Sequence, residues 1–100
     1  MLARLHVIIS SENENDENHI KQLLMNMNDN FSISPSRPYA LLKNHNEFFI
    51  TFQIAENKIE SLLLQLNNDW DGEQESCHCY GFNTKMFHPL VYCLEFDIFH

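Results

Sequence analysis

Two segments of this sequence place apolar residues at the spacing of an amphipathic helix, and the segments around them alternate as strands do. The helical repeats are Ile20, Leu23, Leu24 and Met27 in the first segment and Ile59, Leu62, Leu63 and Leu66 in the second. Ser11 with Glu14 fits a capping box at the start of the first helix, and Asn13 or Asp16 can serve as the cap instead. The second helix is predicted over residues 56–67. Two such helices can cover one face of a sheet.

Strands are predicted in most of the remaining segments. The clearest alternation is Phe48, Ile50, Phe52 and Ile54. Residues 3–9 are apolar on both faces, which is typical of a central strand. Pro35 and Pro38 remove backbone donors and force a break or an edge position. We expect the other strands around residues 31–33 and over 39–43, 77–82 and 91–99, with a hairpin turn at 44–47.

The resulting order is β-α-β-β-α-β with an additional C-terminal strand. It resembles the ferredoxin-like two-layer sandwich, an α+β fold in which two helices cover one face of a mainly antiparallel sheet. In that arrangement the first strand and the strand before the second helix lie centrally, and these two are the richest in apolar residues. The chain has 100 residues, is 44% apolar and shows no long linker. We therefore expect residues 1–100 to form a single domain with one core.

The chain is acidic, and its charge is distributed unevenly. The formal net charge is −8 at pH 7; residues 1–50 carry 4 Lys and Arg against 6 Asp and Glu, and residues 51–100 carry 2 against 8. Nucleic-acid affinity depends on basic residues that release counterions, so direct binding of DNA or RNA is not expected. The same charge steers a basic protein partner toward the surface.

The sequence favours a cytoplasmic protein without a membrane partner. Arg4 and His6 interrupt the apolar N-terminal residues, unlike a signal peptide, and no apolar run approaches the roughly 20 residues that cross a bilayer. Three cysteines, an odd number without an export signal, favour reduced thiols.

No residue pattern indicates catalysis, a metal site or a cofactor. Cys77 and Cys79 flank His78, and in a strand this spacing sends both thiols to one face. Structural zinc sites instead usually have cysteines in a turn that brings the sulfurs together. We therefore expect all three cysteines, Cys93 included, to pack in the core. Glu95 and Asp97 share a face of the last predicted strand. A carboxylate pair there can do acid–base work if that face lines a cleft, and a solvated strand face is the simpler interpretation.

An acidic run follows the second helical repeat. Four carboxylates surround the only tryptophan, and the residues concerned are Asp69, Trp70, Asp71, Glu73 and Glu75. An EF-hand calcium loop has a glycine at its sixth position, whereas Gly72 is the fourth residue from Asp69, so the spacing does not fit. Two interpretations stay open: a solvated loop with the tryptophan folded back onto the core, or a partner-binding surface with the tryptophan as anchor and the carboxylates as steering groups. A second candidate patch consists of Glu12, Glu14, Asp16 and Glu17.

A small, acidic α+β domain with an acidic and aromatic surface loop resembles the immunity proteins of bacterial toxin systems, including those of contact-dependent growth inhibition. The resemblance covers the whole chain and rests on architecture and composition. It implies a cytoplasmic inhibitor that binds a basic toxin domain, often a nuclease, and occludes its active site. Charge would then raise the association rate, and a buried anchor would slow release.

Two other functions stay open. A dimeric ferredoxin-like enzyme or small-molecule-binding domain predicts a stable homodimer and a pocket lined by Phe, Met and His between sheet and helices. An adaptor predicts partner binding without inhibition.

Overall fold

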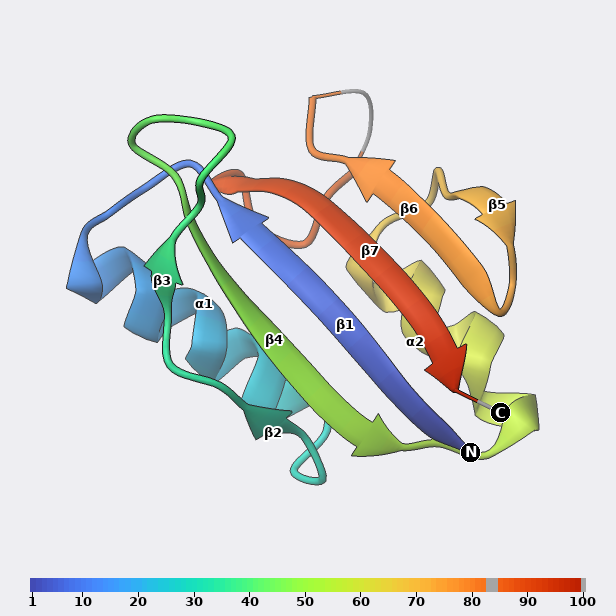
Figure 1. The fold of residues 1–100 in the computed structure, drawn as a ribbon. Coiled ribbons are helices and arrows are strands. Elements are labelled where there is room, and N and C mark those ends of the chain that lie inside the picture. Colours follow the sequence, from blue (N-terminus) through green and yellow to red (C-terminus); the bar gives the residue numbers. More distant parts are fainter. Residues whose placement is uncertain (83–84, 100) are drawn as a thin grey trace.

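The computed structural model has two helices on one side of a seven-stranded sheet, an α+β arrangement (Figure 1). The structure describes residues 1–82 and 85–99. Its elements are β1 (Leu2–Ile9), α1 (Glu14–Met27), β2 (Ser32–Ile33), β3 (Arg37–Pro38), β4 (Asn46–Gln53), the 3-10 helix η1 (Glu56–Lys58), α2 (Ile59–Leu66), β5 (Asp71–Glu73), β6 (Ser76–Tyr80) and β7 (Val91–Phe99). The Cα radius of gyration is 12.7 Å, close to the value of about 13 Å typical of 100 residues.

The sheet is antiparallel at every strand pair in the described residues. Its order is β2-β4-β1-β7-β6-β5, and β3 also pairs with β4. Leu5 of β1, for example, lies between Ile50 of β4 and Phe96 of β7. The last strand, and not the segment predicted over residues 77–82, therefore lies beside β1. The reason is apolar content, because β7 buries a full row of core side chains along its length and β6 buries only two cysteines.

Both predicted helices are present, with ends defined by local hydrogen bonds. Asn13, one of the predicted alternatives, is the N-cap of α1, and its side-chain oxygen accepts from two backbone N–H groups of the first turn at 2.8 and 3.4 Å. The predicted second helix divides into η1 and α2. No helix among the described residues is long and apolar enough to cross a membrane.

The segment between β3 and β4 is a loop and not the predicted strand over residues 39–43. Pro38 lacks an N–H and ends the pairing of β3 with β4 at the sheet edge. The chain then reverses, with the backbone N–H of Tyr39 donating to the carbonyl oxygen of His45 at 2.9 Å. Asn44 has a φ of 62°, a left-handed conformation that Asn tolerates. The strand β4 consequently begins at Asn46, inside the predicted turn at 44–47.

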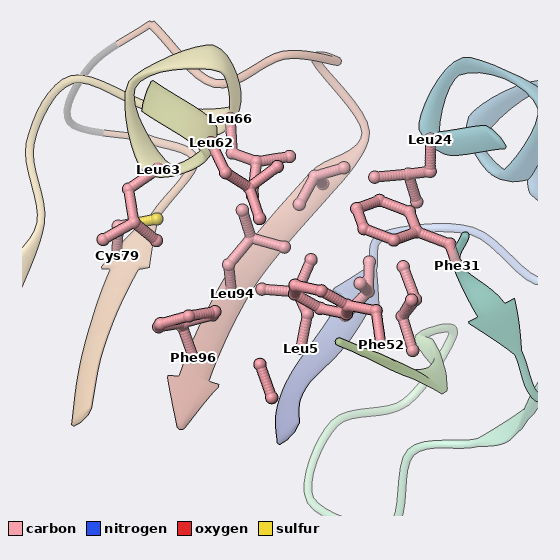
Figure 2. Close-up of a cluster of buried hydrophobic side chains, with 14 of the residues drawn as sticks. Leu5, Leu24, Phe31, Phe52, Leu62, Leu63, Leu66, Cys79, Leu94 and Phe96 are labelled. Carbon is pink, nitrogen blue, oxygen red and sulfur yellow. The ribbon is translucent and has the colours of Figure 1, made fainter. Parts of the chain in front are cut away.

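One hydrophobic core fills the space between the helices and the sheet (Figure 2). It confirms the predicted apolar faces of α2, β1 and β4 and most of those of α1 and β7. Leu23 of α1 is only partly buried, and Tyr92 of β7 is not among the core residues. Cys77 and Cys79 also belong to it, as predicted, and are 6% and 1% exposed. Cys93 is buried as well, at 5% exposed, but it is not part of this core cluster. The side chains labelled in Figure 2 are Leu5, Leu24, Phe31, Phe52, Leu62, Leu63, Leu66, Cys79, Leu94 and Phe96.

Candidate functional site

The predicted acidic loop is largely a β-hairpin at one edge of the sheet, which we call the acidic hairpin (residues 69–76). The strand β5 pairs with the start of β6, and Gln74 and Glu75 form the turn between them. Gly72 permits this conformation, because its φ is +110° and a Cβ there would lie 2.6 Å from the carbonyl oxygen of Ser76. Residues 71–76 are all exposed, and charged side chains on an edge strand oppose the addition of another strand.

Trp70 is folded back onto α2. Its indole N–H donates to the carbonyl oxygens of Leu63 at 2.9 Å and Asn67 at 3.0 Å, at the C-terminal end of the helix. The half-buried ring packs against the core and borders a shallow cavity of about 340 Å³ with Glu60 and Glu73. The structure thus has the folded-back arrangement, and a role for Trp70 in an interface stays a prediction.

The second candidate patch occupies the start of α1. Two of its acidic side chains have partners within the protein: the Ser11 hydroxyl donates to Asp16 at 2.7 Å, and the Asn46 amide donates to Glu17. Figure 1 shows the start of α1 and the strand β5 on opposite sides of the molecule. The two predicted acidic patches therefore do not form one surface.

The sheet face opposite the helices, which we call the open face, carries a group of polar and aromatic side chains. No helix among the described residues covers this face (Figure 1). Strand register places His6 between Phe49 of β4 and Glu95 of β7, and places Glu95 between His6 and His78 of β6. Residues that are up to 89 positions apart in sequence thus become neighbours.

His6 lies between two carboxylates on the open face. Its Nε2 is 2.7 Å from Glu47 Oε1, and its Nδ1 is 3.1 Å from Glu95 Oε1. The ring stacks on Phe49, with 4.3 Å between ring centroids. Glu47 is 8% exposed, and its other oxygen accepts from Arg37 Nε at 3.0 Å. Such partners are needed because a buried unpaired carboxylate is costly.

A cavity of about 400 Å³ lies beside this network. We call it the tyrosine cavity, after the three tyrosines in its wall. Its lining residues are Ile8, Tyr39, Leu41, Leu42, His78, Tyr80, Tyr92, Cys93 and Glu95. Its volume is within the roughly 300 to 1,000 Å³ typical of ligand sites.

A bulge in β7 helps to form this cavity. The register of β1 with β7 shifts between Ile8 and Ile9, which leaves Tyr92 as the extra residue. Bulges of this kind re-aim a side chain and are frequent beside functional sites. Gly81 then brings the end of β6 close: its N–H donates to the carbonyl oxygen of Tyr92 at 2.9 Å, and a Cβ would lie 2.1 Å from the carbonyl oxygen of Val91.

The loop after β3 forms another part of the wall and is held by His45. The Nδ1–H of His45 donates to the carbonyl oxygen of Lys43 at 2.7 Å, its Nε2 is 3.1 Å from the Ser10 hydroxyl, and its ring meets Tyr92 edge-on. Leu41, at the outer part of this loop, is 78% exposed. The cavity is therefore shaped by a fixed loop whose apolar rim faces solvent.

Burial and acidic neighbours control protonation in the cavity wall. Burial, followed by Glu95 and other nearby groups, raises the pKa of Tyr39. Burial, followed by Glu95, raises the pKa of the Cys93 thiol to about 11. Both groups are therefore neutral at pH 7, and Cys93 is not an activated nucleophile. The cavity offers aromatic faces, hydroxyl groups and the carboxylate of Glu95.

The other cysteines are equally inert. Burial, as the largest cause, raises the pKa of Cys77 to about 11 and that of Cys79 to about 12. His78 projects from the opposite face, as predicted. Across residues 1–82 and 85–99, no group of three or more His, Cys, Asp or Glu side chains is arranged to hold a metal ion.

Sequence reasoning missed most of the residues of the open face. Glu95 and Asp97 share a face of β7, as predicted, but they have different surroundings: Glu95 lines the cavity, whereas Asp97 accepts from the Ser76 hydroxyl at 2.9 Å. One signal was available, since Arg4 and His6 are polar positions on the second face of a strand that is otherwise apolar.

Comparison of the chain with protein-family models, curated proteins and solved structures finds no match in any of the three. What the protein does must therefore be inferred from its own geometry and charge.

Proposed function

We propose that the protein is an immunity protein that binds and neutralises a bacterial toxin domain. The target is a basic domain, with a nuclease as the leading candidate, and binding occludes its active site. The observation that carries the proposal is the open face, where a cavity with aromatic walls and a carboxylate is bordered by exposed apolar side chains. Such a combination fits a protein interface better than a solvated surface.

The apolar border of the open face supports a macromolecular partner. Leu41 is 78% exposed and Phe82 is 77% exposed. Phe82 stacks on Tyr80 of the cavity wall with 5.5 Å between ring centroids, so the two exposed groups flank the same hollow. Large apolar groups gathered on one face mark interaction sites, because a partner removes them from water.

The net charge of −8 supports a basic partner. A nuclease needs basic residues to hold its substrate, and an acidic inhibitor exploits the same residues. The acidic hairpin would act chiefly during approach, since its exposed carboxylates are screened by salt and raise the association rate more than the affinity. A desolvated contact at the open face would control dissociation.

We also propose that the fold is a ferredoxin-like sandwich with an inserted hairpin. The short strands β2 and β3 both pair with β4 and can be taken as one interrupted strand. With this grouping, β1, α1, the interrupted strand, β4, α2 and β7 follow the β-α-β-β-α-β order. The strands β5 and β6 are then an insertion that extends the sheet beyond β7.

Affinity capture from a lysate of the native host tests the proposed function. The tagged chain is the bait, at low salt and at about 0.5 M salt, where screening is nearly complete beyond a few ångströms. We expect a basic protein that is retained at high salt and whose activity the chain inhibits. Recovery of the untagged chain alone would contradict the proposal.

A second candidate is a dimeric ferredoxin-like enzyme or small-molecule-binding domain, which the volume of the tyrosine cavity favours. The cavity differs from the one expected for that function, since it lies on the open face and is lined by Tyr and Leu with one His, not by Phe and Met. Light scattering at micromolar concentration separates the candidates: a homodimer supports the second, and a monomer supports the immunity protein.

A further inference from the structure

We propose that the tyrosine cavity receives an arginine side chain of the partner protein. This inference rests on the proposed function, because it names the group of the partner that the open face recognises. The cavity lies where the loop after β3 and the end of β6 approach each other across β1 and β7.

The walls of the cavity suit a planar cation. Tyr39, Tyr80 and Tyr92 all line it, and the rings of Tyr80 and Tyr92 meet at 75° with 6.2 Å between centroids. Because the rings lie at different angles in the wall, they line the cavity with aromatic surface in more than one direction. A guanidinium group is attracted to aromatic faces and stacks on them, which an ammonium group does less well because it is compact and strongly hydrated.

Glu95 supplies the matching charge. Its Oε1 is 3.1 Å from His6 Nδ1, and no hydrogen bond to its Oε2 is present among the described residues. The side chain is 50% exposed, so this oxygen can accept from an incoming N–H group without leaving His6. Hydrogen bonds between guanidinium and carboxylate are among the strong, charge-assisted ones.

The open face already binds one of the chain's own arginines, Arg37, with a carboxylate and an aromatic ring, and a second, Arg4, with aromatic rings alone. Arg37 donates to Glu47 at 3.0 Å while its guanidinium carbon lies 5.5 Å from the ring centroid of Phe49. Arg4 lies over Phe49 and Phe99, at 5.2 and 5.4 Å from the ring centroids. The tyrosine cavity repeats the same combination of aromatic faces and a carboxylate without a guanidinium group of this chain in its wall.

The surroundings of the cavity favour an arginine on a protein over a free small cation. Leu41 lines the cavity, and Phe82 stacks on Tyr80 of its wall; both are more than three quarters exposed. A small cation would leave them in water, whereas a protein surface around the arginine would bury them. Interface hot spots, in which arginine is enriched, are typically surrounded by contacts that add little binding energy themselves but exclude water from the central anchor.

Titration of the ¹⁵N-labelled chain with N-acetyl-arginine amide, followed by NMR, tests the inference without a partner. N-acetyl-citrulline amide is the control, since it has the same shape without the charge. We expect saturable shifts at Tyr39, Tyr92 and Glu95 with arginine, at least about tenfold weaker binding with citrulline, and loss of binding in Glu95→Gln. The matched variant Glu73→Gln removes the same charge on the acidic hairpin and should bind like the wild type.

Equal shifts with arginine and citrulline, or no shifts at the cavity residues, would overturn the inference whatever the partner proves to be. Once a partner is captured, Glu95→Gln should raise its dissociation rate at least about tenfold, and Glu73→Gln should change mainly the association rate. An inhibited toxin whose dissociation is unaffected by Glu95→Gln would refute the arginine site and leave the proposed function standing. Arginine-specific shifts together with a bound partner that keeps full activity would support the arginine site and refute the proposed function.

Discussion

Replacing Trp70 with phenylalanine should destabilise the domain by about 1 to 2 kcal/mol. The substitution removes the indole N–H that donates to Leu63 and Asn67 at the end of α2, and one such hydrogen bond contributes about 0.5 to 1.5 kcal/mol. The smaller ring also buries less apolar area, at about 25 cal/mol per Å². Phenylalanine keeps most of the packing against the core, so the change is smaller than a truncation to alanine.

Urea unfolding followed by far-UV circular dichroism measures this change, because Trp70 is the only tryptophan and its loss removes the fluorescence signal. With a slope near 1.5 kcal/mol per molar urea, we expect the midpoint to fall by about 1 M. Leu64→Ala is the control, since Leu64 lies on the same helix, is 60% exposed, and should change stability by less than about 0.5 kcal/mol. An unchanged midpoint for Trp70→Phe would show that the hydrogen bonds of the indole N–H to the end of α2 do not stabilise the domain. Trp70 would then be available as an anchor for a partner.

Three further predictions concern titration, thiol reactivity and the buried carboxylate. Burial, followed by nearby His19, lowers the pKa of His88. At acidic pH the unfolded chain therefore binds more protons than the folded chain. The stability that comes from keeping His88 neutral is fully present above the ordinary pKa of histidine and is lost as the pH falls below it. Urea midpoints should therefore drop between roughly pH 7.5 and 5 in the wild type, and they should drop less in His88→Asn. The asparagine oxygen in this variant can accept from the Leu90 N–H in place of His88 Nδ1. An equal drop in both proteins would contradict this prediction. The three cysteines should resist a thiol reagent at pH 8 and react fully in urea, because burial raises their pKa values to about 11 or 12; rapid reaction in the native protein would show that they are accessible. Glu47→Ala should cost about 2 kcal/mol in urea unfolding, less than for a fully buried pair because its partner Arg37 is exposed, and an unchanged midpoint would mean that the network does not stabilise the sheet.

The elements that depend on periodicity could be predicted from the sequence. The alternation of Phe48, Ile50 and Phe52 and the helical repeat around Leu62 and Leu63 each bury the predicted face. Apolar spacing decides these elements because burial of one face dominates their energetics. Short segments were assigned less well. The acidic run contains a strand, and residues 39–43 do not form one although most of them are apolar, because the chain reverses between Pro38 and Asn46.

The tyrosine cavity could not be predicted, because it depends on register. His6, Glu47 and Glu95 meet only when β1 lies between β4 and β7, and strand order is not encoded in any local pattern. The bulge that leaves Tyr92 unpaired with β1 is likewise a property of the assembled sheet. The acidic residues could be identified from the sequence because their charge does not depend on the fold. The aromatic wall of the cavity could not, because strand pairing brings its residues together.

The activity of the captured partner, titrated with the purified chain, tests the central proposal most directly. We expect the activity to fall in proportion to added chain and to vanish at about one equivalent, as tight occlusion of an active site requires. Full activity in the saturated complex would contradict neutralisation and would identify the chain as an adaptor that binds without inhibiting.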